Sequence, residues 1–505
     1  MKAPTTRVHS ARATEAGALA RGPRFTVSLG RLGPLASVLA ITAFAATTFA
    51  PRDAGAAGLY FSDRGVRPLG RGGAFVAGAD DVSAMWYNPA GLADAGSSFL
   101  FDSAWLNFSS SFARQTNVPS AGGTVYTDSF QSVNGNTPFL PLPTIGGSYK
   151  VGPVTLALGA FAPNTAVASY PLTLGDGTPS PSRYSLVSLN GSALVVTGLW
   201  AAFKPVNWFQ AGLGVEALVG NFDSTVVFSA CPPSSLVCAA EDPQYDAFSQ
   251  LKVGPIVAPS GNGGLTFLAG EHVRIGISGQ LPFAIDAPAT ITVRLPNAPE
   301  FDNASQQGSS AHVKFNLPAV LRGGVEGRFK AGPGDLRIEG TYEREFWDNH
   351  QSIDITPDNI TLVGIKGFPS PFAVSKISIP RGFQDSNSFR VGAEYSFKIA
   401  GYGMDARLGG NYETSAIPSN YLSPLTVDMN KFFLGLGGSL HLVGHLRLDA
   451  VYGHVFASTV YVDPATAAVP KVNPVQGNPA PSEKVNGGTY TAQADIWGVG
   501  LNYRF

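Results

Sequence analysis

The chain has 505 residues, of which 14% are charged, 59 are glycine and 38 are proline. This composition is typical of a β-rich protein with many turns and argues against a mainly helical one. The formal net charge of -1 supplies neither a basic field for nucleic acid nor an acidic field for a basic partner.

Residues 1–56 have the pattern of an export signal with an upstream extension. Arg21, Arg24 and Arg31 precede an apolar stretch over residues 35–49, which ends near Ala54-Gly55-Ala56. A basic region, a short apolar region and a small-residue cleavage site predict a secretory signal peptide, and the alternative is an ordinary buried N-terminal helix. We favour cleavage after Ala56, because cleavage after Ala50 would leave a proline directly behind the cut.

Residues 57–96 do not alternate and form a compact segment before the first strand. Asp80 or Asp81 is placed to cap a short helix that runs to about Tyr87. Pro89 lacks a backbone donor and disfavours helical geometry at Asn88, so the helix must end there. Such a glycine-rich segment could fill the lumen of a large barrel, which encloses more space than its own inward side chains can pack.

From residue 97 onward the sequence falls into segments of period two. In the last segment, Trp497, Val499, Leu501 and Tyr503 share one face, while glycine and polar residues share the other. Alternation of this kind indicates a strand with one apolar and one polar face. We expect fourteen strands, near residues 97–112, 144–151, 153–161, 185–204, 207–228, 247–269, 272–281, 311–330, 333–348, 387–400, 402–415, 430–442, 444–457 and 491–505.

The connections between these strands alternate strictly between short and long. Short turns such as VGP and AGEH alternate with long connections over residues 113–143, 162–184, 229–246, 282–310, 349–386, 416–429 and 458–490. Outer-membrane barrels combine short periplasmic turns with long external loops, and closure removes unpaired sheet edges. We therefore expect an all-β fold in which residues 97–505 form a transmembrane antiparallel barrel; the alternative is a soluble exported propeller or sandwich.

One short turn carries an aromatic cluster that favours the membrane interpretation. Trp200, Phe203, Trp208 and Phe209 flank it, as an interfacial aromatic girdle would require. The terminal Phe505 closes an aromatic-rich strand, which agrees with the pattern of outer-membrane barrels. No internal repeat supports a propeller.

The two cysteines, Cys231 and Cys238, lie six residues apart in the proline-rich sequence CPPSSLVC. In an exported protein this spacing predicts a small disulfide that staples a loop. The alternatives are a metal pair or two free thiols, but neither a second cysteine pair nor a histidine cluster completes a zinc site.

Charged residues on the predicted inner face carry both signs, and we expect them to pair across neighbouring strands. This set comprises Arg322, Glu326, Arg328, Arg337, Glu339, Arg390, Glu394 and Arg407. Any one of its members Arg322, Arg337, Arg390 and Arg407 could instead hold the carboxylate of a ligand.

Four parts of the chain resemble a known family. GVRPLGRGGAFVAGADDVSAMWYNPAGLA (residues 65–93) is similar to the N-terminal hatch of the FadL/TodX family of outer-membrane transport proteins for long-chain fatty acids and aromatic hydrocarbons. PTIGGSYKVGPVTLALGAFAPNTAVASYP with the strands that follow it, and the terminal GVGLNYRF, are also similar. The resemblance implies a plug or gate that contains Asn88, Pro89, Ala90 and Gly91.

The resemblance also implies a transport route. A hydrophobic ligand is captured at the external loops, binds in the lumen beside the plug, and is released when the plug shifts or through a lateral opening at a kink in the third strand. The matching stretch runs from about Val154 to Pro163. Gly159 and Pro163 are the expected points of irregularity there, since glycine and proline weaken or interrupt a ladder.

We therefore expect an outer-membrane channel that imports hydrophobic small molecules, with long-chain fatty acids as the first candidates. A water-filled pore offers nothing to a ligand whose transfer into water costs about 0.8 kcal/mol per methylene. The alternatives are an aromatic-hydrocarbon channel of the same fold, which needs no carboxylate partner, and a general porin or structural barrel, which has no use for a plug.

No catalytic motif accompanies these features. Asp80 and Asp81 are interpreted as helix caps, LGRGGAFVAG lacks the signature of a phosphate-binding loop, and neither G-x-S-x-G nor H-E-x-x-H occurs. We expect no enzyme activity, no cofactor and no metal site. The expected partners are a hydrophobic ligand and lipid of the outer membrane of a double-membraned bacterium, without nucleic acid, and the barrel is expected to be a monomer.

Overall fold

The computed structural model describes residues 55–56, 63–119, 125–137, 140–162, 168–231, 242–442, 445–475 and 483–505. The predicted signal peptide and its extension lie outside these ranges except for Gly55–Ala56. The backbone of those two residues forms β1, which pairs in parallel with β22 (Ser415–Ala416). Cleavage after Ala56 stays a prediction.

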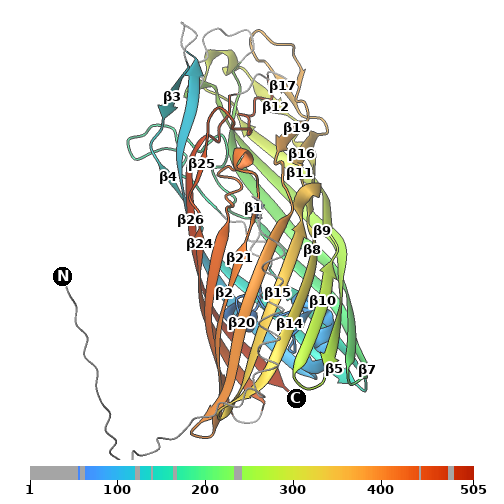
Figure 1. Ribbon diagram of the computed structural model, residues 1–505. Helices are drawn as coiled ribbons and strands as arrows, with labels where there is room; N and C mark the ends of the chain where they lie inside the picture. Colours follow the sequence, from blue (N-terminus) through green and yellow to red (C-terminus); the bar gives the residue numbers. More distant parts are fainter. Residues whose placement is uncertain are drawn as a thin grey trace, which may run out of the picture.

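The chain closes into an antiparallel barrel of fourteen strands (Figure 1). The first wall strand, β2, pairs with β5 on one side and with the last strand, β26, on the other, which closes the wall. Some wall positions consist of two successive strands, such as β10 and β11, which both pair with β9. In wall order the strands are β2 (Ser98–Pro119), β5 (Leu140–Val151), β6 (Val154–Phe161), β7 (Ala193–Val206), β8 (Phe209–Ser229), β9 (Asp246–Ala269), β10 (Val273–Gln280) with β11 (Phe283–Arg294), β14 (Ala319–Ala331) with β13 (Ser310–Leu317), β15 (Gly334–Phe346) with β16 (Ser352–Pro357), β20 (Ser386–Ile399) with β19 (Ile377–Pro380), β21 (Tyr402–Glu413), β23 (Lys431–His441), β24 (Leu446–Ala457) and β26 (Gly488–Arg504).

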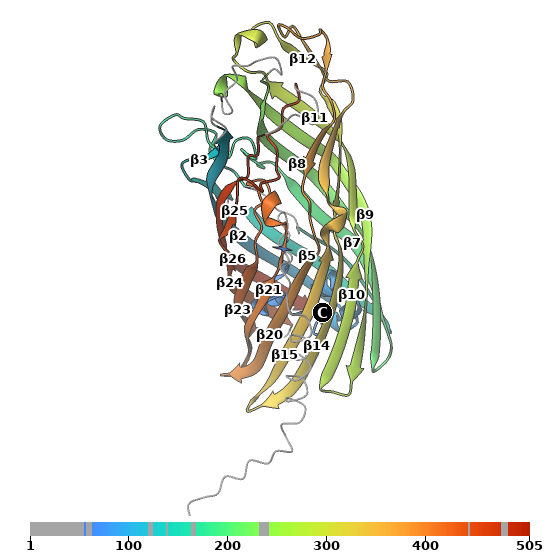
Figure 2. The same ribbon diagram turned by 45° about the horizontal axis from the view of Figure 1, so that its top comes forward.

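The expected alternation of connections is present. The short turns lie together at the lower end of the barrel in Figure 1, and the long connections rise at the upper end, where Figure 2 shows them tilted forward. The long connections carry small elements of their own: β3 (Val125–Ser129), β4 (Val133–Asn136), β12 (Ser305–Gln307), β17 (Thr361–Val363), β18 (Phe372–Ala373), β22, β25 (Val460–Val462), and the 3-10 turns η3 (Pro243–Tyr245), η4 (Pro299–Phe301), η5 (Trp347–Asn349) and η6 (Ser419–Tyr421).

Several wall strands extend farther outward than the sequence suggested. Residues 282–310 and 349–386, expected as long connections, contain β11, β16 and β19. Pro282 interrupts the alternation, but β9 has 24 residues and therefore offers a partner to both β10 and β11. In contrast, β7 begins only at Ala193, because part of the segment before it forms isolated bridges instead of a ladder.

The outward faces of the strands carry the apolar surface that a membrane barrel needs. Leu199, Leu213 and Val215 are 67%, 71% and 76% exposed. Trp200 does not belong to the aromatic girdle as expected, because it alternates with Leu199 and therefore points inward. It is 2% exposed, and its indole nitrogen donates to Glu216 at 3.2 Å. Trp208, at 58% exposed, faces outward. Among the described residues, no helix is long and apolar enough to cross a membrane.

Candidate functional site

The described part of the predicted plug segment, residues 63–96, lies inside the barrel near the short turns (Figure 1). It contains α2 (Val66–Gly70), α3 (Ala84–Tyr87), η2 (Pro89–Gly91) and α4 (Leu92–Ala95). As predicted, the helix before the proline ends at Asn88, whose backbone is extended. The proposed cap is wrong for Asp80, whose carboxylate binds arginines instead, while Asp81 accepts from the Ser83 amide at 3.0 Å.

Asn88 fastens the plug to the wall between β8 and β9. Its side-chain amide donates to the Thr266 hydroxyl at 3.0 Å and to the Val76 carbonyl at 2.9 Å, and its oxygen accepts from the Ala90 amide. The side chain is fully buried. The Asn88-Pro89-Ala90 triplet therefore links the end of α3, the preceding plug loop and the barrel wall in one contact.

Inward glycines of the wall let the plug backbone approach the strands closely. A Cβ atom added to Gly212 of β8 would lie 2.3 Å from the Pro89 carbonyl carbon, and one added to Gly264 of β9 would lie 2.1 Å from the Asn88 side-chain oxygen. Similar contacts occur on other strands, for example between Gly276 and the Val76 carbonyl. The plug is therefore packed against the wall without intervening side chains.

Replacing Gly212 by alanine should destabilise the plugged barrel by about 1–3 kcal/mol, because the added methyl group overlaps the plug backbone. The unfolding temperature of purified protein, followed by heat-dependent electrophoretic mobility, would measure the effect. Gly323→Ala is the matched control, since a Cβ atom there meets nothing within 4 Å. Equal unfolding temperatures for the two variants would contradict this close packing.

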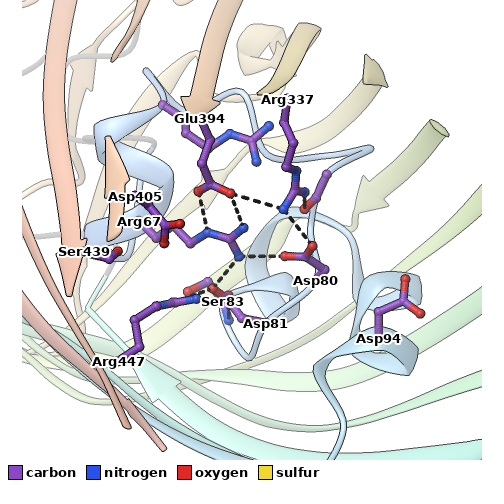
Figure 3. Close-up of polar contacts among 12 residues, drawn as sticks. Arg67, Asp80, Asp81, Ser83, Asp94, Arg337, Glu394, Asp405, Ser439 and Arg447 are labelled. Carbon is purple, nitrogen blue, oxygen red and sulfur yellow. Dashed lines mark hydrogen bonds and ion pairs between the residues drawn. The ribbon is translucent and has the colours of Figure 1, made fainter. Parts of the chain in front are cut away.

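An ion-paired layer surrounds the plug, and Arg67 of α2 lies at its centre (Figure 3). The Arg67 guanidinium bonds Glu394 of β20 through two nitrogens at 2.7 and 2.8 Å, and Asp80 at 2.6 Å. Arg337 of β15 reaches Asp80 at 2.9 Å and Glu394 at 3.2 Å. Burial alone would raise the pKa of Asp80, but the surrounding arginines outweigh it and hold that pKa well below its usual range.

Glu339 of β15 holds the plug loop that follows α2. Its carboxylate accepts hydrogen bonds from the backbone amides of Val76, Ala77 and Gly78 at 2.7, 2.7 and 3.0 Å, and an ion pair with Arg71 at 2.9 Å completes the contact. Glu339 and Arg71 are both fully buried. Removing one member of such a group would leave an unpaired charge in the interior.

The four arginines predicted as ligand partners all belong to this layer and already bind protein carboxylates. Arg322 pairs with Glu343; Arg337 with Asp80, Glu326 and Glu394; Arg390 with Asp63 and Glu343; and Arg407 with Glu394, Asp405 and Asp449. The predicted cross-strand pairing of inward charges is present, for example between Arg407 and Glu394 on paired strands, but much of the layer also joins wall to plug.

At the predicted lateral opening, Gly159 lies in a regular ladder, whereas the pairing of the wall beyond the end of β6 is irregular. Gly159 lies in regular pairing with Gly146 and Gly198, and its missing side chain makes room for Met85 of the plug. β6 ends at Phe161, and Pro163 lies outside the described residues. Above this end, isolated bridges join Ser169 to Asn136 and to Ser188 in the part of the wall that the structure describes.

Two small apolar chambers lie above the plug layer, toward the long connections. The inner chamber is lined by strand residues such as Val226 and Ile379 and by the loop residues Leu425 and Val472. The outer chamber lies farther along β8 and β11, and its lining, which includes Ala230 and Val293, is apolar apart from Gln306. Phe228, Ile291 and Ile377 line both, so the chambers adjoin. Each has a volume of about 40 Å³, which is room for about two or three water molecules.

Arg381, just after β19, is the cation of the inner chamber. It is 1% exposed, and among the described residues its side chain makes only a weak contact, of 3.4 Å from Nη1 to the Thr426 hydroxyl. Its Nε and Nη2 atoms have no hydrogen-bond partner among the described residues, and the Ser185 hydroxyl in the same lining is also unpartnered. Burial lowers the pKa of Arg381 from its ordinary value, because the charged form is poorly solvated there.

Sequence reasoning missed Arg381. It follows the short apolar strand ISIP, and no motif distinguishes it from the other arginines. Its burial depends on residues 423–425 and 469–472, which come from other long connections. The predicted disulfide is described only at Cys231, which is disulfide-bonded, while Cys238 lies outside the described residues. Among described residues, no group of three or more His, Cys, Asp or Glu could hold a metal ion.

The chain is a closed antiparallel β-barrel whose lumen holds the described residues 63–96. Residues 47–505 match the family described as "Outer membrane protein transport protein (OMPP1/FadL/TodX)", so the chain belongs to that family. A comparison with curated protein sequences gives no match.

Solved structures of similar fold include the Pseudomonas aeruginosa FadL homologue, with 15% identity over 89% of this chain and 100% of that chain and a TM-score of 0.67. The Pseudomonas putida toluene transporter TodX has 13% identity over 88% and 99% of the two chains and a TM-score of 0.58. The Ralstonia pickettii toluene transporter TbuX has 17% identity over 88% and 99% and a TM-score of 0.54. At these identities the likeness shows the fold alone.

Proposed function

We propose that this family member imports long-chain fatty acids, that it is a channel and not an enzyme, and that Arg381 holds the ligand carboxylate. The observation that carries the proposal is a buried guanidinium, unpaired on two nitrogens among the described residues, in an apolar chamber. A carboxylate would accept charge-assisted hydrogen bonds from Nε and Nη2 and offset the cost of burying the charge. A hydrocarbon such as toluene offers no acceptor to these atoms.

The position of Arg381 also gives the ligand an orientation. Ile377 lines both chambers, whereas Ile379 and Arg381, farther along the same stretch, line only the inner one. A fatty acid bound with its carboxylate at Arg381 would therefore extend its acyl chain toward the outer chamber. The small chamber volumes mean that the lining residues must move apart to admit it.

We propose lateral release through the wall above β6. The plug below is packed against wall glycines and held by buried ion pairs, such as those of Arg67 and Glu339, so moving it as a unit would break many contacts at once. Among the described residues, the wall beside Ser169 and Ser188 is instead joined by isolated bridges with two backbone hydrogen bonds each, which are less costly to separate than a long ladder.

Binding measurements on purified protein in lipid nanodiscs would test the substrate class. Oleate should bind saturably, and oleyl alcohol, which has the same chain without the carboxylate, should bind at least about tenfold more weakly because it loses charge-assisted hydrogen bonds. Toluene should not displace oleate. Equal affinities for oleate and oleyl alcohol would favour the hydrocarbon channel, whereas large steady ion conductance with no binding of any ligand would favour a general porin.

A further inference from the structure

A small sheet covers the outer chamber at the external end of the barrel. It consists of β12, β17 and β18, forms a unit separate from the barrel sheet, and lies near the top of Figure 1. Its residues come from two neighbouring long connections, over 298–307 and 358–374, and we call these two segments the lid. β12 pairs with β17, so the two connections are joined to each other.

The underside of the lid closes the outer chamber. Phe301, Ile360 and Leu362 are at most 7% exposed and contribute to the apolar lining, opposite the wall residues Ala230 and Ala247. Entry from the outside into this chamber therefore requires the apolar residues of the lid to separate from the wall.

The side chain of Gln306 of β12 joins the lid to β11. Its oxygen accepts from the Val293 amide at 2.9 Å, and its nitrogen donates to the Ile291 carbonyl at 2.8 Å, both on β11. Two residues later, Gly308 has a φ of 73°, a left-handed conformation that favours glycine, and it forms the turn back into the wall. The neighbouring Gln307 is exposed, and its side chain makes no hydrogen bond within the described part of the chain.

We propose that the lid is an entry gate, that Gln306 is its latch, and that its opening exposes the outer chamber to hydrophobic molecules from outside. The lid is held by Gln306, by a hydrogen bond from Tyr245 to Glu300 at 3.3 Å and by Asp358, whose amide donates to the Ser310 carbonyl of β13 at 2.9 Å. Opening it therefore breaks fewer hydrogen bonds than separating wall strands. The lining of the outer chamber is apolar apart from Gln306, so the apolar chain of an entering molecule would contact it first. The link to fatty acids rests on the proposed function, but the gate itself does not.

The rate at which a thiol in the chamber reacts with a water-soluble maleimide measures lid opening without any ligand. Ala247→Cys places the thiol on β9 in the chamber lining with a small change in volume. Adding Gln306→Ala should raise the labelling rate about tenfold, because two hydrogen bonds that hold the lid closed are lost. Gln307→Ala on the same strand is the matched control and should leave the rate unchanged.

Protein without Ala247→Cys gives the background labelling, and heat-dependent mobility confirms that each variant is folded. Equal labelling rates with and without Gln306→Ala, or an equal increase from Gln307→Ala, would overturn the gate. Oleate binding is measured separately on the same proteins. If the proteins do not bind oleate but Gln306→Ala still raises the labelling rate, the proposed substrate is rejected and the gate is kept. If they bind oleate but Gln306→Ala leaves the labelling rate unchanged, the gate alone is rejected.

Discussion

Replacing Arg381 by methionine is expected to lower the affinity for oleate by about 10- to 100-fold, because the ligand loses charge-assisted hydrogen bonds that contribute roughly 1.5–3 kcal/mol. The affinity for oleyl alcohol should stay within a factor of about two, since the apolar lining is retained. Titration of both ligands against protein in nanodiscs would measure the difference.

The same substitution should stabilise the unliganded barrel. Methionine has a similar length and removes a buried charge that lacks a carboxylate partner among the described residues, which costs about 1–3 kcal/mol. Lower oleate affinity together with a higher unfolding temperature would distinguish a binding residue from a structural one. Arg294→Met, at an exposed position of β11, is the control. Unchanged oleate affinity in Arg381→Met would refute its role as the carboxylate partner.

Replacing Glu339 by glutamine is expected to loosen the plug. The new amide group would face the Gly78 amide or the Arg71 guanidinium, both of which are donors, and the buried Arg71 would lose one of its two carboxylate partners. Disrupting a buried ion pair costs about 3–5 kcal/mol. Planar-bilayer recordings of Glu339→Gln should show increased ion conductance. Deletion of residues 63–96 should give the largest increase in conductance, because it removes the plug altogether.

Glu271→Gln, in an exposed short turn, is the control for this experiment. Conductance equal to that of the unmodified protein in both Glu339→Gln and the deletion would show that residues 63–96 do not block the lumen. Oleate uptake into cells separates the two release routes. Uptake that stays constant while conductance rises agrees with lateral release, whereas uptake that rises with conductance supports release past the plug.

Much of the fold could be predicted from the sequence because strand alternation and turn length are local properties. The face shared by Trp497, Val499 and Tyr503 is exposed as expected, and the alternation of short and long connections correctly indicated a closed barrel. The errors have local causes. Trp200 was assigned to a girdle by its proximity to a turn, although its parity with Leu199 places it inside.

The site could be predicted only in part, because its members are distant in the chain. Asn88-Pro89 marked the end of α3, but the contact of Asn88 with Thr266 required the closed barrel. Arg67 and Glu394 are 327 positions apart, so no spacing pattern could reveal their pairing. Inward arginines were correctly identified, yet which of them are neutralised by protein carboxylates depends on how the plug sits in the lumen.

The sequence by itself therefore determined the class of fold, the barrel limits and the break at Asn88-Pro89, since these depend on residue parity, turn composition and the geometry of proline. Only the tertiary structure decided which charges are paired, that Arg381 is buried with two unpartnered nitrogens among the described residues, and that Gln306 joins the lid to β11. The physical reason is that burial and pairing arise when strands and loops far apart in the chain surround the same space.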